Sequence, residues 1–239
     1  MVVRHCCGAV SFSVKPRELP SVCRDGYSAP TASSMIETLA IVIAYLLGSV
    51  PFAYIVARAK SRIDIRGVDI GNVGAGSVMR AVGLREGIFV LAADIAKGTG
   101  AVLAAQALEV GLPWVLASGL AAVLGHIYPV YIGFRGGQGI ATMIGVFLAV
   151  APKSMGLALA VMGIVLLFNL RRGGSRRLFL VVACGAPFVP LFTYAVYHSV
   201  TLTAYTVVLI AYVALRNRKG LRQPGSITRR LLGETEHGR

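Results

Sequence analysis

The chain has 239 residues, of which 56% are hydrophobic and only 14% charged. A soluble domain carries roughly 25% charged residues, so this composition, with a mean hydropathy of +0.72, predicts an all-α, polytopic membrane protein. The net charge of +14 is interpreted as a topology signal and an attraction to anionic lipid. Nucleic acid is not expected as a partner, because the sequence lacks the aromatic and basic interleaving of a single-strand binder.

Residues 1–34 differ from the rest of the chain. They are rich in Ser, Pro and charge, and they lack the continuous apolar stretch of a signal peptide. Because Met35 stands immediately before the first apolar span, we expect 1–34 to be a disordered leader or an over-extended translation. Residues 35–217 are expected to form a transmembrane domain, and 218–239 a basic cytoplasmic tail.

The first predicted span is 36–57, about the length needed to cross ~30 Å of hydrocarbon, with a kink expected near Pro51. A polar loop is predicted over 58–86. The second span, 87–108, contains Asp94 and Lys97, which share a helix face at i, i+3. Ionisable groups in a membrane usually face the bundle interior. Two alternatives remain open: the two residues form a structural pair, or Lys97 reaches toward a phosphate site.

The third predicted span is 112–132. The apolar stretch 139–170 is too long for one helix, and Pro152 divides it into two shorter ones; residues 178–217 form two more spans that turn near His198 and Ser199. This gives seven spans. Basic residues concentrate in the loops on one side, while the opposite loops contain only Lys153 once 1–34 are set aside. The positive-inside rule therefore predicts an outside N-terminus and a cytoplasmic C-terminus.

Two glycine-rich motifs lie on the predicted cytoplasmic side, at 66–80 (RGVDIGNVGAGSVMR) and 125–142 (GHIYPVYIGFRGGQGIAT). Glycine allows positive φ and close approach to a ligand, consecutive N–H groups form anion-binding concavities, and arginine suits phosphate. A helix beginning at Ile140 would add further N–H groups. The alternative is that these glycines only turn the chain between helices. The predicted phosphate-binding residues are Arg66, Gly71, Asn72, Gly74, Arg80, Lys97, Arg135, Gly136, Gly137, Gly139 and Thr142.

The candidates for catalysis are His126 and Arg80. His126 would orient a substrate or relay a proton; alternatively, it caps or packs a helix. The sequence has no CxxC pair, metal-ligand cluster, GxSxG or Walker motif, so neither a metal nor a cofactor is expected.

On these residues, the chain resembles the acyl-phosphate-dependent glycerol-3-phosphate acyltransferases of bacterial inner membranes. The resemblance implies a seven-span bundle whose cytoplasmic site transfers an acyl group from acyl phosphate to the sn-1 hydroxyl of glycerol 3-phosphate. The product, lysophosphatidic acid, enters phospholipid biosynthesis, and the expected partners are membrane lipid and the enzyme that forms acyl phosphate. The matching segments are 48–52, 64–66, 71–75, Arg80, Gly83, Asp94, 97–98, 125–126, Pro129, 134–137, Gly139 and 141–142.

Four positions depart from the family pattern. Ile70 replaces a phosphate-binding serine, Gln138 replaces the lysine of GGKG, and Asn217 replaces a histidine, while Asp69 adds a negative charge. Each lost charge-assisted contact is worth about 1.5–3 kcal/mol. These departures motivate a second hypothesis, a catalytically degenerate paralogue that binds phosphorylated lipid or a membrane partner. An anion transporter is disfavoured, since no inverted repeat is visible.

Overall fold

The computed structural model describes residues 32–67, 73–169 and 184–222. Within these ranges every regular element is helical, which confirms the all-α class. The predicted site residues Gly71 and Asn72, the departures Asp69 and Ile70, and most of the expected leader and tail lie outside the described residues. The elements are α1 Ala32–Ser49, α2 Phe52–Ser61, η2 Ile65–Gly67, α3 Ala75–Ala81, α4 Leu84–Ala107, α5 Leu112–Ile127, η3 Val130–Ile132, α6 Ile140–Val150, α7 Pro152–Asn169, α9 Phe188–Tyr197 and α10 Val200–Arg222.

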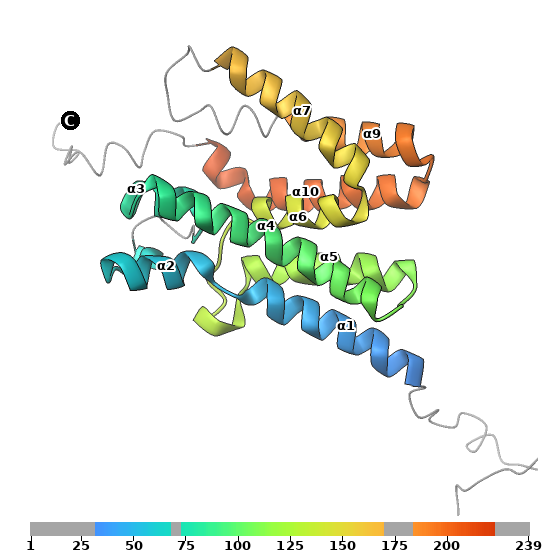
Figure 1. The fold of residues 1–239 in the computed structure, drawn as a ribbon, viewed down its shortest axis with the longest axis horizontal. Helices are drawn as coiled ribbons and strands as arrows, with labels where there is room; N and C mark the ends of the chain where they lie inside the picture. Colours follow the sequence, from blue (N-terminus) through green and yellow to red (C-terminus); the bar gives the residue numbers. More distant parts are fainter. Residues whose placement is uncertain (1–31, 68–72, 170–183, 223–239) are drawn as a thin grey trace, which may run out of the picture.

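Four stretches of the described chain are long and apolar enough to cross a membrane: Ser33–Ser61, Leu84–Ala107, Leu112–Ile132 and Val200–Arg218. Three shorter apolar helices, Ile140–Val150, Pro152–Leu167 and Phe188–Tyr197, accompany them. The long helices run back and forth along one direction (Figure 1). The chain is therefore an integral membrane protein.

The helix breaks fall where the sequence predicts them. α1 ends at Ser49 and α2 begins at Phe52, on either side of Pro51. Pro152 begins α7 directly after α6. Proline has no N–H to donate into the preceding turn, so it ends or kinks a helix. His198 ends α9 in the left-handed conformation, with φ 48°.

The predicted polar loop at 58–86 is wrong in part, because much of it is helical. α2 continues to Ser61, the α3 helix follows Gly74, and α4 begins at Leu84. This segment carries apolar side chains that need cover: Ile65 and Val78 are buried together with Val90 of α4. Helix propensity and polarity alone indicate a loop for this segment. Burial of these apolar side chains instead folds the segment into helices that pack against the bundle.

α4 lies at the centre of the bundle, packed against α1, α2, α3, α5 and α6. Small residues allow the backbones to approach, as expected for membrane helices. A Cβ added at Gly48 would meet the backbone of Ala122, and one at Gly98 would meet the carbonyl oxygen of Thr142. These contacts hold α1 against α5 and α4 against α6.

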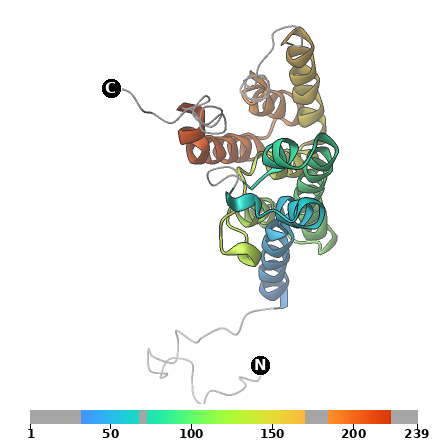
Figure 2. The same ribbon diagram turned by 90° about the vertical axis from the view of Figure 1, so that its left-hand side faces the viewer.

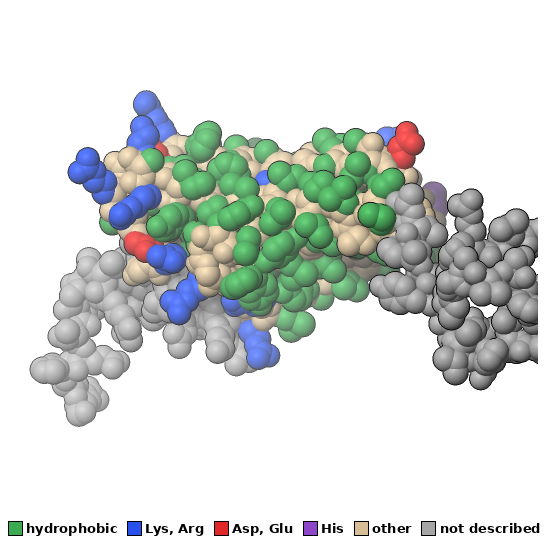
Figure 3. All heavy atoms as spheres, turned by 90° about the horizontal axis from the view of Figure 1, so that it is seen from below, with side chains coloured by type: hydrophobic (Ala, Val, Ile, Leu, Met, Phe, Trp, Pro, Cys, Tyr) green, Lys and Arg blue, Asp and Glu red, His purple; other side chains and the backbone are tan. Residues whose placement is uncertain are grey.

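α7, α9 and α10 form a second group of helices beside the first. α9 packs against both α7 and α10, while α6 contacts α7 and α10. Figures 1 and 2 place α7 and α9 at the opposite edge of the bundle from α1. Hydrophobic side chains cover much of the outer surface, whereas Lys and Arg gather toward the end that carries α2 and α3 (Figure 3). This distribution suits a bundle surrounded by lipid, with one basic end.

Candidate active site

The two glycine motifs meet in the structure. The N–H of Val73, in the middle of the first motif, donates to the carbonyl oxygen of Gly136 in the second, at 3.2 Å. Val73, Gly136 and Gly137 are all buried. α6 begins at Ile140, as predicted, directly after Gly139 with φ 85°. A left-handed residue at this helix start favours glycine.

The second motif folds back onto the end of α5. Gly136 and Gly137 donate their N–H groups to the carbonyls of Ile127 and His126, both at 3.1 Å. A Cβ at Gly136 would strike the His126 carbonyl oxygen, and one at Gly137 would strike Nε2 of the His126 ring. The two glycines therefore allow the turn to lie directly on His126, and their N–H groups already have backbone partners.

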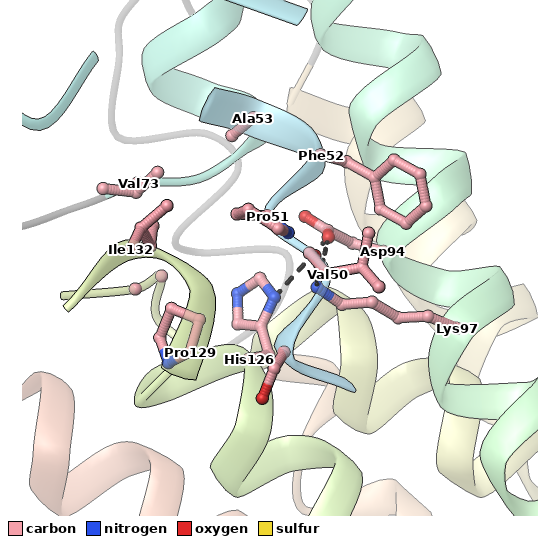
Figure 4. Close-up of a pocket in the computed structure, with 13 residues that line it drawn as sticks. Val50, Pro51, Phe52, Ala53, Val73, Asp94, Lys97, His126, Pro129 and Ile132 are labelled. Atoms are coloured by element: carbon pink, nitrogen blue, oxygen red, sulfur yellow. Dashed lines mark hydrogen bonds and ion pairs between the residues drawn. The ribbon is translucent and has the colours of Figure 1, made fainter. Parts of the chain in front are cut away.

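A buried group of three ionisable side chains lies beneath this turn. Asp94 and Lys97 come from α4 and His126 from α5. Asp94 Oδ1 lies 2.9 Å from Lys97 Nζ and 3.5 Å from His126 Nδ1 (Figure 4). The three side chains are only 3%, 5% and 7% exposed, respectively. The predicted Asp94–Lys97 pair is confirmed, and it includes a histidine from a second helix.

Lys97 also reaches the break between α1 and α2. Its Nζ donates to the carbonyl oxygen of Val50 at 2.9 Å and lies 5.8 Å from the ring centroid of Phe52. Because Pro51 interrupts the helix at this point, the lysine supplies a charged donor to an irregular stretch of backbone. Lys97 thus joins α4 to the α1–α2 break.

A pocket opens where these parts converge (Figure 4). Its walls come from the α1–α2 break, α4, the end of α5 and both glycine motifs. Within the described residues, no group of three or more His, Cys, Asp and Glu side chains could hold a metal ion. The lining residues are Ser49, Val50, Pro51, Phe52, Ala53, Val73, Asp94, Lys97, His126, Pro129, Ile132, Gly136 and Gly137.

Arg66 lies outside this pocket and has an acidic partner. Its guanidinium NH2 is 2.6 Å from Asp64 Oδ2, and it lies 5.3 Å from the centroid of the Tyr54 ring. Hydrogen bonds from Arg66 lower the pKa of Asp64 to about 2. Both side chains are partly exposed, so a ligand would have to compete with Asp64 for this arginine.

The remaining predicted residues are distributed around the pocket. Arg80, on α3, and Arg135, in the turn before α6, are exposed and do not line it. Thr142 is buried against Gly98 of α4. Gly74 caps the start of α3, directly after the lining residue Val73. The structure thus brings His126, Lys97, Gly136 and Gly137 together, and it places the two arginines at the surface.

Asp94, Ser49 and the Val50 carbonyl line the pocket but were not predicted as site residues. The i, i+3 spacing of Asp94 and Lys97 in the sequence could have indicated Asp94 as a site residue. No feature of the sequence indicates a role for the Val50 carbonyl. Asn217 of α10 donates from Nδ2 to the carbonyl oxygen of Gln138 at 3.0 Å. Two of the four departures from the family pattern, Gln138 and Asn217, therefore contact each other through a backbone carbonyl of the second motif.

Comparisons with known proteins agree with these features. A family model described as glycerol-3-phosphate acyltransferase matches residues 38–223. The glycerol-3-phosphate acyltransferase of Geobacter sulfurreducens is 41% identical over 188 residues, covering 78% of this chain and 93% of that protein. The protein of the same name from Endomicrobium trichonymphae is 35% identical over 189 residues, covering 79% and 92%.

A solved structure is also similar to this chain over most of the length of both proteins. It is the crystal structure of PlsY (YgiH), an integral membrane glycerol 3-phosphate acyltransferase, in its glycerol 3-phosphate form. The two chains share 31% identity with a TM-score of 0.67, covering 85% of this chain and 96% of that one. The family model, the relatives and the solved structure each cover most of this chain, and the chain belongs to the glycerol-3-phosphate acyltransferase family.

Proposed function

We propose that this protein is a membrane glycerol-3-phosphate acyltransferase that uses acyl phosphate and forms lysophosphatidic acid for phospholipid biosynthesis. The observation that carries the proposal is the meeting of both glycine motifs above His126, through the Val73–Gly136 hydrogen bond. Family membership supports it, as do the glycerol 3-phosphate and lysophosphatidic acid forms in which the related PlsY was solved. The enzyme that makes acyl phosphate is its expected functional partner.

The proposed topology has seven spans in the inner membrane, with the N-terminus outside and the active face cytoplasmic. The apolar helices run in alternating directions (Figure 1), and basic side chains gather at the end with α2 and α3 (Figure 3). α6 has 11 residues, or about 16 Å at 1.5 Å per residue. Because this length is less than the ~30 Å hydrocarbon thickness, we expect longer helices to surround α6 in the membrane.

In the proposed site, two arginines, one on α3 and one in the turn before α6, hold the phosphoryl oxygens. Arg80 and Arg135 supply charged, planar donors, and the first turn of α6 supplies free N–H groups. The N–H groups of Gly136 and Gly137 donate to carbonyls at the end of α5. The proposed role of these two glycines is therefore to leave space above His126, because they have no side chains. The other proposed contributors to phosphate binding are Arg66, Gly71, Asn72, Gly74, Lys97, Gly139 and Thr142.

The proposed reaction needs little chemical assistance, because an acyl phosphate is already activated. The sn-1 oxygen of glycerol 3-phosphate attacks the acyl carbon, and the bond between that carbon and the phosphate oxygen breaks. Phosphate leaves with the electron pair, and the hydroxyl proton passes to His126. The protein mainly positions the two anionic substrates and neutralises their charge.

The test is an assay of purified protein with palmitoyl phosphate and glycerol 3-phosphate. We expect lysophosphatidic acid and inorganic phosphate in equal amounts, and no transfer by an Arg80→Ala variant. Gly100→Ala is the matched control, since a Cβ at this α4 position has no neighbour within 4 Å. Turnover of Arg80→Ala at the wild-type rate would remove the proposed role of this arginine.

A degenerate, lipid-binding paralogue is the second candidate. The observation that favours it is the hydrogen bond from the neutral Asn217 side chain to the backbone carbonyl of Gln138 in the second motif, together with Ile70. The discriminating experiment is the double variant Ile70→Ser with Gln138→Lys. If wild-type protein is inert and the double variant transfers acyl groups, the paralogue reading holds; an active wild type excludes it.

A further inference from the structure

We propose that the turn at residues 128–135, together with Arg216 of α10, is a binding site for anionic phospholipid at the edge of the pocket. The lipid headgroup lies against the guanidinium, and the aromatic side chains of the turn lie at the boundary between headgroups and acyl chains. Binding of the lipid is independent of the reaction. Only its effect on turnover rests on the proposed acyl transfer.

The turn lies where the chain leaves the apolar part of the bundle. The candidate span Leu112–Ile132 ends within it, and its short helix η3, drawn in lime green, projects from the side of the bundle in Figures 1 and 2. Two side chains of the turn, Pro129 and Ile132, line the pocket. Two others, Tyr131 and Phe134, are 57% and 58% exposed. The turn therefore separates the pocket from the surroundings of the protein.

The backbone of the turn is strained at the residue whose ring is exposed. Phe134 has φ 59° and follows Gly133 with φ 70°. This left-handed conformation is an outlier for a bulky residue, and it costs free energy that other interactions must offset. In water, the strain and the exposed ring would both be unfavourable. Aromatic side chains are stabilised at a membrane–water interface, so burial of the ring in that interface offsets the cost of the turn.

Arg216 places a cation beside the turn. Its guanidinium carbon lies 5.8 Å from the centroid of the Tyr128 ring, and the Tyr128 hydroxyl oxygen accepts hydrogen bonds from Arg216 and Tyr212. Asn217, the next residue of α10, donates to the carbonyl oxygen of Gln138. The end of α10 is thus joined to the chain at both ends of the turn, while the Arg216 side chain stays exposed.

The exposed arginine and the exposed rings together match the chemistry of an anionic phospholipid. A guanidinium forms charge-assisted, bidentate hydrogen bonds with phosphate. Anionic lipids of the cytoplasmic leaflet attract basic residues near the surface, and the net charge of +14 favours such lipids. A soluble anion could contact Arg216 but would leave the rings of Tyr131 and Phe134 in water. A phospholipid supplies a partner for both.

A lipid bound here also acts on the wall of the pocket. Pro129 and Ile132 belong to this wall, and the turn continues directly into Gly136 and Gly137, which line the same pocket. Small displacements at a reaction site lower the rate strongly. We therefore expect anionic lipid to raise turnover by holding the turn in one position.

The first test measures where the exposed face of the turn lies. Trp114 is the one tryptophan of the chain, so the full-length double variant Trp114→Phe with Phe134→Trp carries a single indole at position 134. In phosphatidylglycerol vesicles brominated on the acyl chains near the headgroup, we expect most of its fluorescence to be quenched, and acrylamide in the water to have little effect. Quenching by acrylamide and not by the brominated lipid would overturn the inference.

The second test measures the preference for an anionic headgroup. Native mass spectrometry of the full chain in detergent compares phosphatidylglycerol and phosphatidylcholine bound at equal lipid concentrations. We expect about a fivefold preference for phosphatidylglycerol, the contribution of one basic residue near an anionic surface. Arg216→Gln should lose this preference, while Arg218→Gln, the same change at another exposed position of α10, should keep it. Equal binding of both lipids by the wild type, or equal losses in both variants, would overturn the inference.

Turnover separates this inference from the proposed function. In the acyl-transfer assay, kcat of the wild type should be higher in vesicles of equal parts phosphatidylglycerol and phosphatidylcholine than in phosphatidylcholine alone, and Arg216→Gln should lose most of this difference. An inert wild type that still prefers phosphatidylglycerol would support the lipid site and overturn the proposed function. An active wild type with no lipid preference would support the proposed function and overturn the lipid site.

Discussion

The helices α1–α6 and the second group, α7, α9 and α10, differ in how they are held together. In the first group, glycines let backbones touch, and Asp94, Lys97 and His126 are buried together. In the second group, the buried polar side chains among the described residues are hydroxyls, such as Thr193, whose Oγ1 donates to the carbonyl of its own helix at Val189. Of the most apolar part of Leu112–Ile132, 67% is buried, against 17% for Val200–Arg218.

The comparison indicates where a membrane enzyme can accommodate charge. Charges cost free energy in an apolar interior unless paired, so they are found where close helix packing holds both partners at fixed distances. Among the residues that the structure describes, none from α7, α9 or α10 lines the pocket, and Asn217 of α10 reaches only the neighbouring carbonyl oxygen of Gln138. We therefore expect substitutions in the two groups to differ sharply in effect.

The largest difference is expected between two glycine-to-alanine substitutions. Gly137→Ala places a methyl group against Nε2 of His126 and near the Val73 carbonyl, whereas a Cβ at Gly163 of α7 has nothing within 4 Å. We expect Gly137→Ala to lower kcat/KM at least about 100-fold, because a small displacement at a reaction site has this effect. Gly163→Ala should retain wild-type turnover in the same assay, and equal losses would contradict the comparison.

The next difference concerns buried polar groups. Lys97→Met leaves Asp94 without its cation, and breaking a buried pair costs about 3–5 kcal/mol. Thr193→Val removes one hydroxyl that bonds within its own helix, and it should cost about 1 kcal/mol or less. Unfolding of both variants in detergent, followed by circular dichroism, gives the two values; similar losses would show that Asp94 and Lys97 are not held as described.

A smaller effect is expected where the two groups meet. Asn217→Ala removes the hydrogen bond from α10 to the Gln138 carbonyl, which is worth about 0.5–1.5 kcal/mol. Because the carbonyl belongs to the turn before α6, KM for glycerol 3-phosphate should rise while kcat changes little. Asn217→Asp, which keeps the shape but not the donor, should behave like the alanine variant; wild-type kinetics in both would show that this contact does not affect the turn.

The smallest effect is expected at the Asp64–Arg66 pair, which is partly exposed at the edge of the first group. The pKa of Asp64 falls from 3.8 to about 2 through its hydrogen bonds with Arg66. A lowered pKa contributes stability above the unfolded value, and this contribution is lost as pH falls through the folded value. The melting temperatures of wild type and Asp64→Asn should therefore differ slightly at pH 6 and converge near pH 2; a gap that widens in acid would contradict this sign.

The sequence predicted the membrane class, the helix breaks and the grouping of glycine motifs, because these depend on local residue types. Pro51 and Pro152 mark breaks because proline interrupts a helix, and the polar residues His198 and Ser199 interrupt an apolar stretch. The Asp94–Lys97 pair follows from helix spacing. The third member, His126, comes from another helix, and the Val50 carbonyl becomes available only because α1 breaks beside α4. Such contacts between distant segments depend on tertiary packing, which no local pattern encodes.

The helical part of 58–86 was missed for a related reason. Its polar and glycine residues indicate a loop, yet Ile65 and Val78 are buried against Val90 of α4. The N–H groups of Gly136 and Gly137 likewise suggest an anion site until the end of α5 supplies carbonyl partners. In both segments, packing against α4 or α5 outweighs the local preference.

The most direct measurement of the central claim compares two histidine substitutions in the acyl-transfer assay with palmitoyl phosphate. His126→Gln removes the ring beneath the glycine motifs, while His198→Gln changes the turn between α9 and α10. The account predicts that His126→Gln loses about 10²-fold or more in kcat and that His198→Gln retains wild-type turnover. Equal turnover by both variants, with both folded in the membrane, would contradict the account.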